Sequence, residues 1–184
     1  MTIPTRNERL ELWKFAYARA SFIDADMFLD ELFTSRLPLE HPGRKAISVA
    51  VTTAYARPFK QRPPVRLSED LVPPRHKDTH DSIIEIRDKS VAHRDVDGPI
   101  ADFGLLNQVR FAVRDSTVFV DTISPILPDD KARQVQALVK ELIPKMQYHV
   151  NKYIKKFFTG SGTSDGMYEM SLEPSPDRWL RRLT

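Results

Sequence analysis

The chain has 184 residues, enough for one domain with a sizeable hydrophobic core, and its 28 basic and 25 acidic residues leave a net charge of +3. It contains no cysteine, which excludes a disulfide framework, a cysteine-based zinc site and thiol chemistry, and permits a reducing cytoplasm. The first residues, MTIPTRNERLELW, meet charges before any apolar run, and no window approaches the roughly 18 uninterrupted apolar residues of a membrane span. We therefore expect a cytoplasmic protein without a signal peptide or membrane contact.

Two helices are expected at the start of the chain. The first runs from about Thr5 to Phe33, where residues recur at helical spacing with one polar interruption: Leu10, Trp13, Tyr17, Ala20, Asp24, Met27, Phe28 and Leu32. Pro42 and Gly43 precede a second helix at about residues 44–56, which is rich in Ala, Val and Ile and should be deeply packed. Pro58 stops this second helix.

A proline-rich loop leads to a third helix. Residues 59–74 contain Pro63, Pro64, Pro73 and Pro74, which favour a loop. The third helix follows at about residues 74–92, with acidic residues near its N-terminus, and Gly98 and Pro99 end it.

In the second half of the chain, the spacing of apolar residues changes from helical to alternating and then becomes helical again. Residues 109–123 alternate apolar and polar side chains around an Asp115-Ser116 turn, which predicts a small hairpin packed on the helices. A last long helix is expected from Asp129 to about Phe158, interrupted near Pro144. Residues 159–184 are expected to form a flexible tail, with a short helical turn near its end.

The segment 83–95, IIEIRDKSVAHRD, carries most of the functional information. On an ideal helix of about 100° per residue, Arg87 falls near the middle of an apolar arc. The arc consists of Ile83, Ile84, Ile86 and Val91. A guanidinium keeps its proton even there, so it needs a partner or an interface that solvates it. His93 is the side-chain type whose ordinary pKa suits proton transfer near neutral pH.

Arg87 and His93 are six positions apart, about 120° around one helix, so a single helix does not hold them in contact. Two copies that cross at a two-fold axis would bring two arginines and two histidines into one cleft. The stretch RDKSVAH, from Arg87 to His93, resembles the R-x(4–6)-H signature of the HEPN superfamily, with five residues between arginine and histidine. The sequence YARPF at residues 55–59 is also similar to some HEPN groups. The resemblance covers residues 5–158.

This resemblance implies a mainly α-helical up-and-down bundle that dimerises through the motif helix; the inserted hairpin is expected from its own pattern. It also implies metal-independent cleavage of RNA, in the kind of enzyme found in toxin–antitoxin and antiphage systems. His93 would move the proton of the ribose 2′-hydroxyl or of the leaving oxygen, and Arg87 would stabilise charge on the phosphorane. Asp88 matches the polar residue that follows the arginine in HEPN nucleases. No cofactor is expected, and the implied partners are a second copy, RNA and an antitoxin protein.

A non-catalytic function stays open beside the nuclease. Arg87 and His93 would then form a structural dimer contact or a satisfied core pair, and the domain would bind a protein or a ligand. Ser90, on the apolar face, favours close helix packing over a nucleophilic role. Asp95 stands where HEPN toxins silenced by a partner nucleotidyltransferase carry a tyrosine, which argues against that mode of regulation.

Basic residues outside the motif have two interpretations. Arg57 could contact an RNA phosphate or cap the carbonyl end of its helix, and the cap is favoured. Lys152, Lys155 and Lys156 alternate with aromatic residues, which fits either a face that follows RNA or the basic end of an amphipathic helix.

His76 and His80 have the i, i+4 spacing that can hold a metal ion. Lys77 excludes the metalloprotease motif, which has glutamate at that position. Because the local sequence offers no compelling further ligand, we expect a solvated first helical turn and no metal site.

Overall fold

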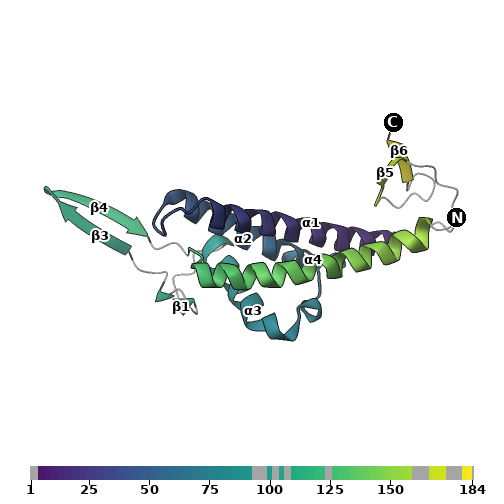
Figure 1. Ribbon diagram of the computed structural model, residues 1–184, viewed down its shortest axis with the longest axis horizontal. Helices are drawn as coiled ribbons and strands as arrows, with labels where there is room; N and C mark the ends of the chain where they lie inside the picture. Colours follow the sequence, from purple (N-terminus) through teal and green to yellow (C-terminus); the bar gives the residue numbers. More distant parts are fainter. Residues whose placement is uncertain are drawn as a thin grey trace.

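The computed structural model describes residues 4–92, 99–100, 104–105, 109–122, 126–158, 166–172 and 180–183. It is mainly helical, which confirms the predicted fold class. Two long helices, α1 (Arg6–Thr34) and α4 (Asp129–Phe158), run side by side along the long axis of the molecule, in purple and green in Figure 1. The shorter helices α2 (Pro42–Ala56) and α3 (Lys77–Ile86) pack beside them.

Helices α1 and α4 are antiparallel over nearly their whole length. Three side-chain contacts mark this pairing from one end to the other: Glu8 with Lys156, Phe15 with His149, and Asp30 with Gln136. The Phe15 and His149 rings stack with centroids 4.3 Å apart, and the Gln136 amide donates to Asp30 at 2.7 Å. The long pair therefore forms a continuous scaffold for α2 and α3.

The face of α1 that enters the core differs from the expected one. Met27 and Phe28, expected on the buried face, are 64% and 37% exposed. The buried face instead lies roughly a third of a turn away on a 100° wheel and includes Phe15, Ala18, Phe22, Ala25 and Leu29. Small alanines on this face let α2 and α4 approach closely, whereas the expected stripe rested on apolar residues at helical spacing. The expected stripe was therefore wrong for most of α1.

A buried arginine fastens α2 to the start of α4. Arg44 is 6% exposed, and its guanidinium donates to the Leu127 carbonyl at 3.1 Å and pairs with Asp129. The start of α2 is itself capped by the His41 side chain, which accepts from the Gly43 N–H at 3.0 Å. Because buried cations need such partners, this contact joins two elements that are far apart in sequence.

The expected loop between the second and third helices contains three short 3-10 turns: η1 (Arg57–Lys60), η2 (Glu69–Leu71) and η3 (Pro74–His76). Lys145 on α4 donates to the Leu71 carbonyl at 2.8 Å, so this connection lies against the bundle. Helix α3 ends at Ile86, and the chain continues as a π-helical turn, η4 (Arg87–Ala92). The expected α-helix to Ala92 is therefore wrong beyond Ile86.

The predicted hairpin is present as β3 (Val109–Arg114) and β4 (Thr117–Thr122), joined at Asp115 and Ser116 with positive φ angles of 50° and 61°. It is not packed on the helices but projects beyond one end of the bundle (Figure 1). A second strand pair, β1 (Pro99–Ile100) with β2 (Gly104–Leu105), was not expected. Its two-residue strands are too short to show alternation in the sequence.

Helix α4 continues through Pro144, so the expected interruption is wrong. Proline removes one N–H from the helical ladder, and the carbonyl that loses this donor belongs to Lys140, an exposed residue that water can reach. Beyond α4, β5 (Met167–Met170) pairs antiparallel with β6 (Leu180–Leu183). The expected terminal helical turn is therefore wrong at residues 180–183, because pairing with β5 overrides the local spacing of its leucines.

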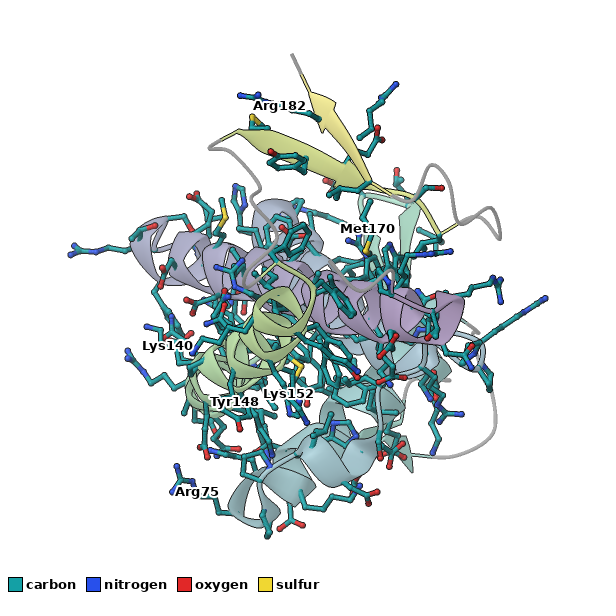
Figure 2. The ribbon with its side chains drawn as sticks, turned by 90° about the vertical axis from the view of Figure 1, so that its right-hand side faces the viewer. Arg75, Lys140, Tyr148, Lys152, Met170 and Arg182 are labelled. Atoms are coloured by element: carbon teal, nitrogen blue, oxygen red, sulfur yellow. The ribbon has the colours of Figure 1, made fainter. Side chains whose placement is uncertain are left out.

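One strand of this pair, β5, is in contact with the helical bundle. Met170 packs against the hydrophobic core. Figure 2 shows Met170 turned toward the helices and Arg182 on the paired strand turned away from them. Met170 thus places β5 against the bundle.

Candidate functional site

The motif segment carries an ion cluster that consists of Lys60, Arg87 and Asp88, here called the motif cluster. Arg87 Nη1 donates to Asp88 Oδ1 at 2.8 Å, and Lys60 Nζ donates to Asp88 Oδ2 at 2.6 Å. Lys60 ends η1, whereas Arg87 and Asp88 begin η4. Asp88 therefore holds the motif turn against the chain that leaves α2.

The motif cluster is partly open to solvent. The exposed fractions of the side chains are 26% for Lys60, 32% for Arg87 and 38% for Asp88. Partial burial raises the pKa of Asp88, but the hydrogen bonds and positive charges of Lys60 and Arg87 lower it more, so the net shift is downward. Asp88 is thus a carboxylate at neutral pH, and Arg87 keeps donors that a ligand can reach.

The apolar arc around Arg87 is covered by its own chain. Ile83 and Ile86 are each 2% exposed and belong to the hydrophobic core. They line one narrow space with Leu127 and Val135. These two residues of the arc are therefore buried within one chain, without a second copy. Arg87 itself has an intramolecular carboxylate partner but is not sequestered.

His93, the other half of the predicted pair, and Asp95 lie outside the residues that the structure describes. The π-helical turn nevertheless changes the geometry that the sequence argument used. A turn with i→i+5 bonding rotates successive residues by less than the α-helical 100°, so the wheel positions assumed after Arg87 do not hold. π-Helical turns are frequent at functional sites.

Of the other basic candidates, the three lysines of α4 lie away from the motif cluster, whereas Arg57 shares the turn η1 with Lys60. Arg57 is half exposed and its Nη1 lies 3.7 Å from Asp24 on α1, so its side chain joins helices. Ile86, which precedes the motif, lines the same space as Val135 on α4. Lys152 follows Val135 by 17 residues, about 25 Å along α4, and is therefore far from the motif.

Lys155 and Lys156 lie farther still along α4. All three lysines are exposed, and Lys156 pairs with Glu8 at the other end of the molecule from the motif cluster. The structure therefore does not bring these lysines to the motif.

A second polar cluster lies at the beginning of α3. It consists of Tyr55, Glu69, Lys77, His80 and Asp81 and is here called the histidine cluster. His80 is 1% exposed, and its Nδ1 shares a hydrogen bond of 2.7 Å with the Tyr55 hydroxyl. The His80 ring also meets the Phe59 ring edge-on, with centroids 4.6 Å apart. The imidazole is thus held rigidly in the core.

The open side of the histidine cluster is acidic and contains one lysine. His80 Nε2 lies 4.0 Å from Glu69 Oε2. Lys77 Nζ lies 3.2 Å from Glu69 Oε2 and 3.0 Å from Asp81 Oδ1. The hydrogen bonds with Asp81 and Glu69 raise the pKa of Lys77, so it is a cation that balances the two carboxylates.

Burial dominates the titration of the two core groups. It lowers the pKa of His80, with a further decrease from the charge of Lys77, against the opposite effect of the carboxylates. Burial also raises the pKa of Tyr55, helped by the charges of Asp81 and Glu69. At neutral pH the pair is therefore a neutral imidazole and a protonated phenol.

The structure separates the two histidines that the sequence suggested as a metal pair. His76 Nε2 contacts Glu141 on α4 at 3.2 Å, whereas His80 turns into the core. The expected solvated first turn is wrong for His80, because a buried tyrosine supplies its partner. The partner was not visible in the sequence, since Tyr55 precedes His80 by 25 positions.

Two other residues were also missed. Lys60 and Glu69 lie in the stretch that was expected to be a loop, and neither has a motif around it. The YARPF similarity did include Tyr55, but as a family resemblance and without a contact assigned to it.

None of the helices in the described part of the chain is long and apolar enough to cross a membrane. Comparisons of the chain with protein-family models, curated proteins and solved structures found no match.

Proposed function

We propose that this protein is a HEPN-type endoribonuclease that cleaves single-stranded RNA without a metal ion. The proposal rests on one observation above all: Arg87, the first residue of the motif, keeps about a third of its side chain exposed while Asp88 holds it on a π-helical turn. A fixed, accessible guanidinium suits a phosphate because its planar donors match two oxygens at once.

The reaction would proceed by transfer of the phosphate to the neighbouring ribose oxygen. His93 would take the proton from the 2′-hydroxyl, and the freed oxygen would attack phosphorus. The bond to the 5′-oxygen would break, and that oxygen would take up a proton. The products are a 2′,3′-cyclic phosphate and a 5′-hydroxyl, and Arg87 would stabilise the charge that develops on the phosphate oxygens.

Dimerisation belongs to this proposal. Six positions separate Arg87 and His93, and two protomers that meet at η4 would place both pairs along one cleft. Such an enzyme would act in the cytoplasm, in a toxin–antitoxin or antiphage system, with an antitoxin protein as a further partner. Arg57, which shares η1 with Lys60, would contact RNA beside the motif cluster, and the three lysines of α4 would contribute at most to binding remote parts of the RNA.

A cleavage assay in EDTA tests the proposal. Purified protein should cut a labelled single-stranded RNA and leave a cyclic phosphate, but should leave DNA of the same sequence intact because DNA lacks the attacking hydroxyl. His93→Ala should lower the rate by about 10²–10⁴-fold, and Arg87→Lys should also be poorly active. Lys89→Ala is the matched control, because Lys89 is a cation of equal exposure on the same turn.

A non-catalytic dimeric interaction domain is the second candidate. The observation that favours it is the Arg87–Asp88 pair, because an arginine with an internal carboxylate partner can serve structure alone. If wild type and His93→Ala are equally inert on varied RNAs while sedimentation shows an intact dimer, the interaction domain replaces the nuclease. A monomer at micromolar concentration would remove the dimeric cleft from both candidates.

A further inference from the structure

We propose that Glu69, His80 and Asp81 bind one divalent transition-metal ion of the Zn²⁺ type. One potential ligand atom from each residue lies within 4.8 Å of the other two. This site is separate from the motif cluster and plays no part in the proposed RNA cleavage. It joins η2 to the first turns of α3.

The imidazole supplies the strongest argument. His80 is 1% exposed, and its Nε2 is buried without a hydrogen-bond partner among the described residues. A buried polar atom without a partner is costly, so native proteins rarely leave one. This nitrogen lies toward Glu69, 4.0 Å from a carboxylate oxygen. A metal ion placed between them would satisfy both atoms.

The other face of the imidazole is already arranged for metal binding. A histidine that binds a metal through one ring nitrogen usually donates the other ring N–H to a fixed acceptor. The Tyr55 hydroxyl oxygen, 2.7 Å from Nδ1, can accept that hydrogen bond. The resulting tautomer directs the lone pair of Nε2 toward the carboxylates.

The remaining adjustment is small and falls on mobile side chains. In a tetrahedral zinc site with ligand bonds of about 2.1 Å, the ligand atoms lie about 3.4 Å apart. The observed separations require a closure of at most about an ångström and a half from this distance. Glu69 and Asp81 are 43% and 57% exposed, so their carboxylates can move while His80 stays fixed. Solvent would supply the fourth ligand.

The donor set selects the class of ion. Imidazole nitrogen favours zinc and its neighbours over Mg²⁺ and Ca²⁺, which prefer all-oxygen sites. Lys77 bridges the same two carboxylates and is therefore the competitor. Because Lys77 is 44% exposed, its ammonium can turn into solvent when an ion enters. Removal of Lys77 should consequently strengthen binding.

Calorimetric titration of the chelator-treated full-length protein with ZnCl₂ tests the site, in neutral buffer without RNA. We expect one Zn²⁺ per chain, a rise in the melting temperature and no comparable effect of MgCl₂. Co²⁺ should give the visible absorption of a low-coordinate nitrogen and oxygen site. Lys77→Gln should bind more tightly than wild type, and Asp81→Asn should bind about tenfold or more weakly.

The controls separate this site from other surface ligands. Asp78→Asn removes an exposed carboxylate from the same first turn of α3 and should leave the affinity unchanged. His76→Ala should also leave it unchanged, because His76 contacts Glu141 instead. Glu69→Gln is preferred to a His80 variant, since Glu69 is exposed and its loss should not unfold the protein.

The proposal would be overturned if neither wild type nor Lys77→Gln bound Zn²⁺, because Lys77 would then be the resident cation. It would also be overturned by Zn²⁺ binding that survives both Glu69→Gln and Asp81→Asn, or by Mg²⁺ binding as tight as that of Zn²⁺. The assay contains no RNA, so its failure and the failure of the proposed nuclease are independent results.

Discussion

The two polar clusters beside α3 are opposite in construction. In the motif cluster, two cations share one carboxylate at the surface, and each of the three side chains is between about a quarter and two fifths exposed. In the histidine cluster, a neutral imidazole and phenol are buried together, and the charges stay on the solvent side. The first arrangement leaves groups available to a ligand, whereas the second couples a polar contact to the packing of the core.

This difference predicts which cluster supports the stability of the fold and which can be changed without unfolding it. Exposed ion pairs contribute little to folding because water screens them and because long side chains lose entropy when they are fixed. Buried hydrogen-bonded groups contribute more, since the loss of one partner leaves the other without a bond and without water. Substitutions in the histidine cluster should therefore lower stability, and substitutions in the motif cluster should leave the fold intact.

The largest effect is expected from His80→Ala. The change removes a ring that packs against Phe59 and leaves the Tyr55 hydroxyl without its partner, so the free energy of unfolding should fall by about 3 kcal/mol. Urea unfolding monitored by circular dichroism measures this. His76→Ala, which removes a more exposed histidine of the same segment, should cost less than about 1 kcal/mol. Equal losses for the two variants would contradict the proposed distinction.

Tyr55→Phe should have an intermediate effect. The phenylalanine ring keeps the packing against Phe22 and Phe59 but leaves Nδ1 of His80 buried without a partner. We expect a loss of about 1.5 kcal/mol in the same unfolding experiment. Tyr148→Phe, at an exposed position on α4, is the control and should change stability little. If Tyr55→Phe leaves the free energy of unfolding unchanged, the hydroxyl contributes nothing to the stability of the fold.

A smaller effect is expected when the motif cluster is broken. Lys60→Ala and Asp88→Asn should each change the free energy of unfolding by less than about 1 kcal/mol, because both side chains are partly exposed. In a double-mutant cycle, the coupling energy between the two should be about 0.5 kcal/mol and should decrease with added salt. A coupling of several kcal/mol would place Asp88 among the structural residues of the core.

The helical periodicity was sufficient to predict the fold class and most helix positions. Thr5, Pro42 and Pro58 marked where helices begin or end, and the alternation at residues 109–123 predicted β3 and β4. These features depend on residues that are close together in the sequence, so the sequence alone is enough to predict them. The predicted buried face of α1 was wrong, because the rotation of a helix about its axis depends on which helices pack against it. A single sequence does not contain this tertiary information.

The candidate sites were predictable to different extents. Arg87 and Asp88 form a contact between adjacent residues, and a motif directs attention to them. Lys60 joins them only through the path of the chain after α2. The contact of Tyr55 with His80 spans 25 positions and has no periodic signature. Long-range polar contacts of this kind follow from the fold and cannot be predicted from the spacing of residues in the sequence.

The smallest effect, and the most specific to the motif cluster, is expected in the titration of Asp88. Its folded-state pKa should lie below the ordinary value of about 3.9, because the hydrogen bonds of Lys60 and Arg87 outweigh the opposing effect of partial burial. A pKa lowered on folding gives a stabilisation that is present above the unfolded value and is lost as the pH falls through the folded value. Carboxyl carbon chemical shifts in NMR measure the midpoint. Lys60→Ala should raise this midpoint toward the ordinary value, whereas Lys89→Ala, which removes the partner of Glu85 instead, should leave it nearly unchanged. An Asp88 midpoint that is ordinary in wild type and insensitive to Lys60→Ala would show that the motif cluster does not hold together in solution.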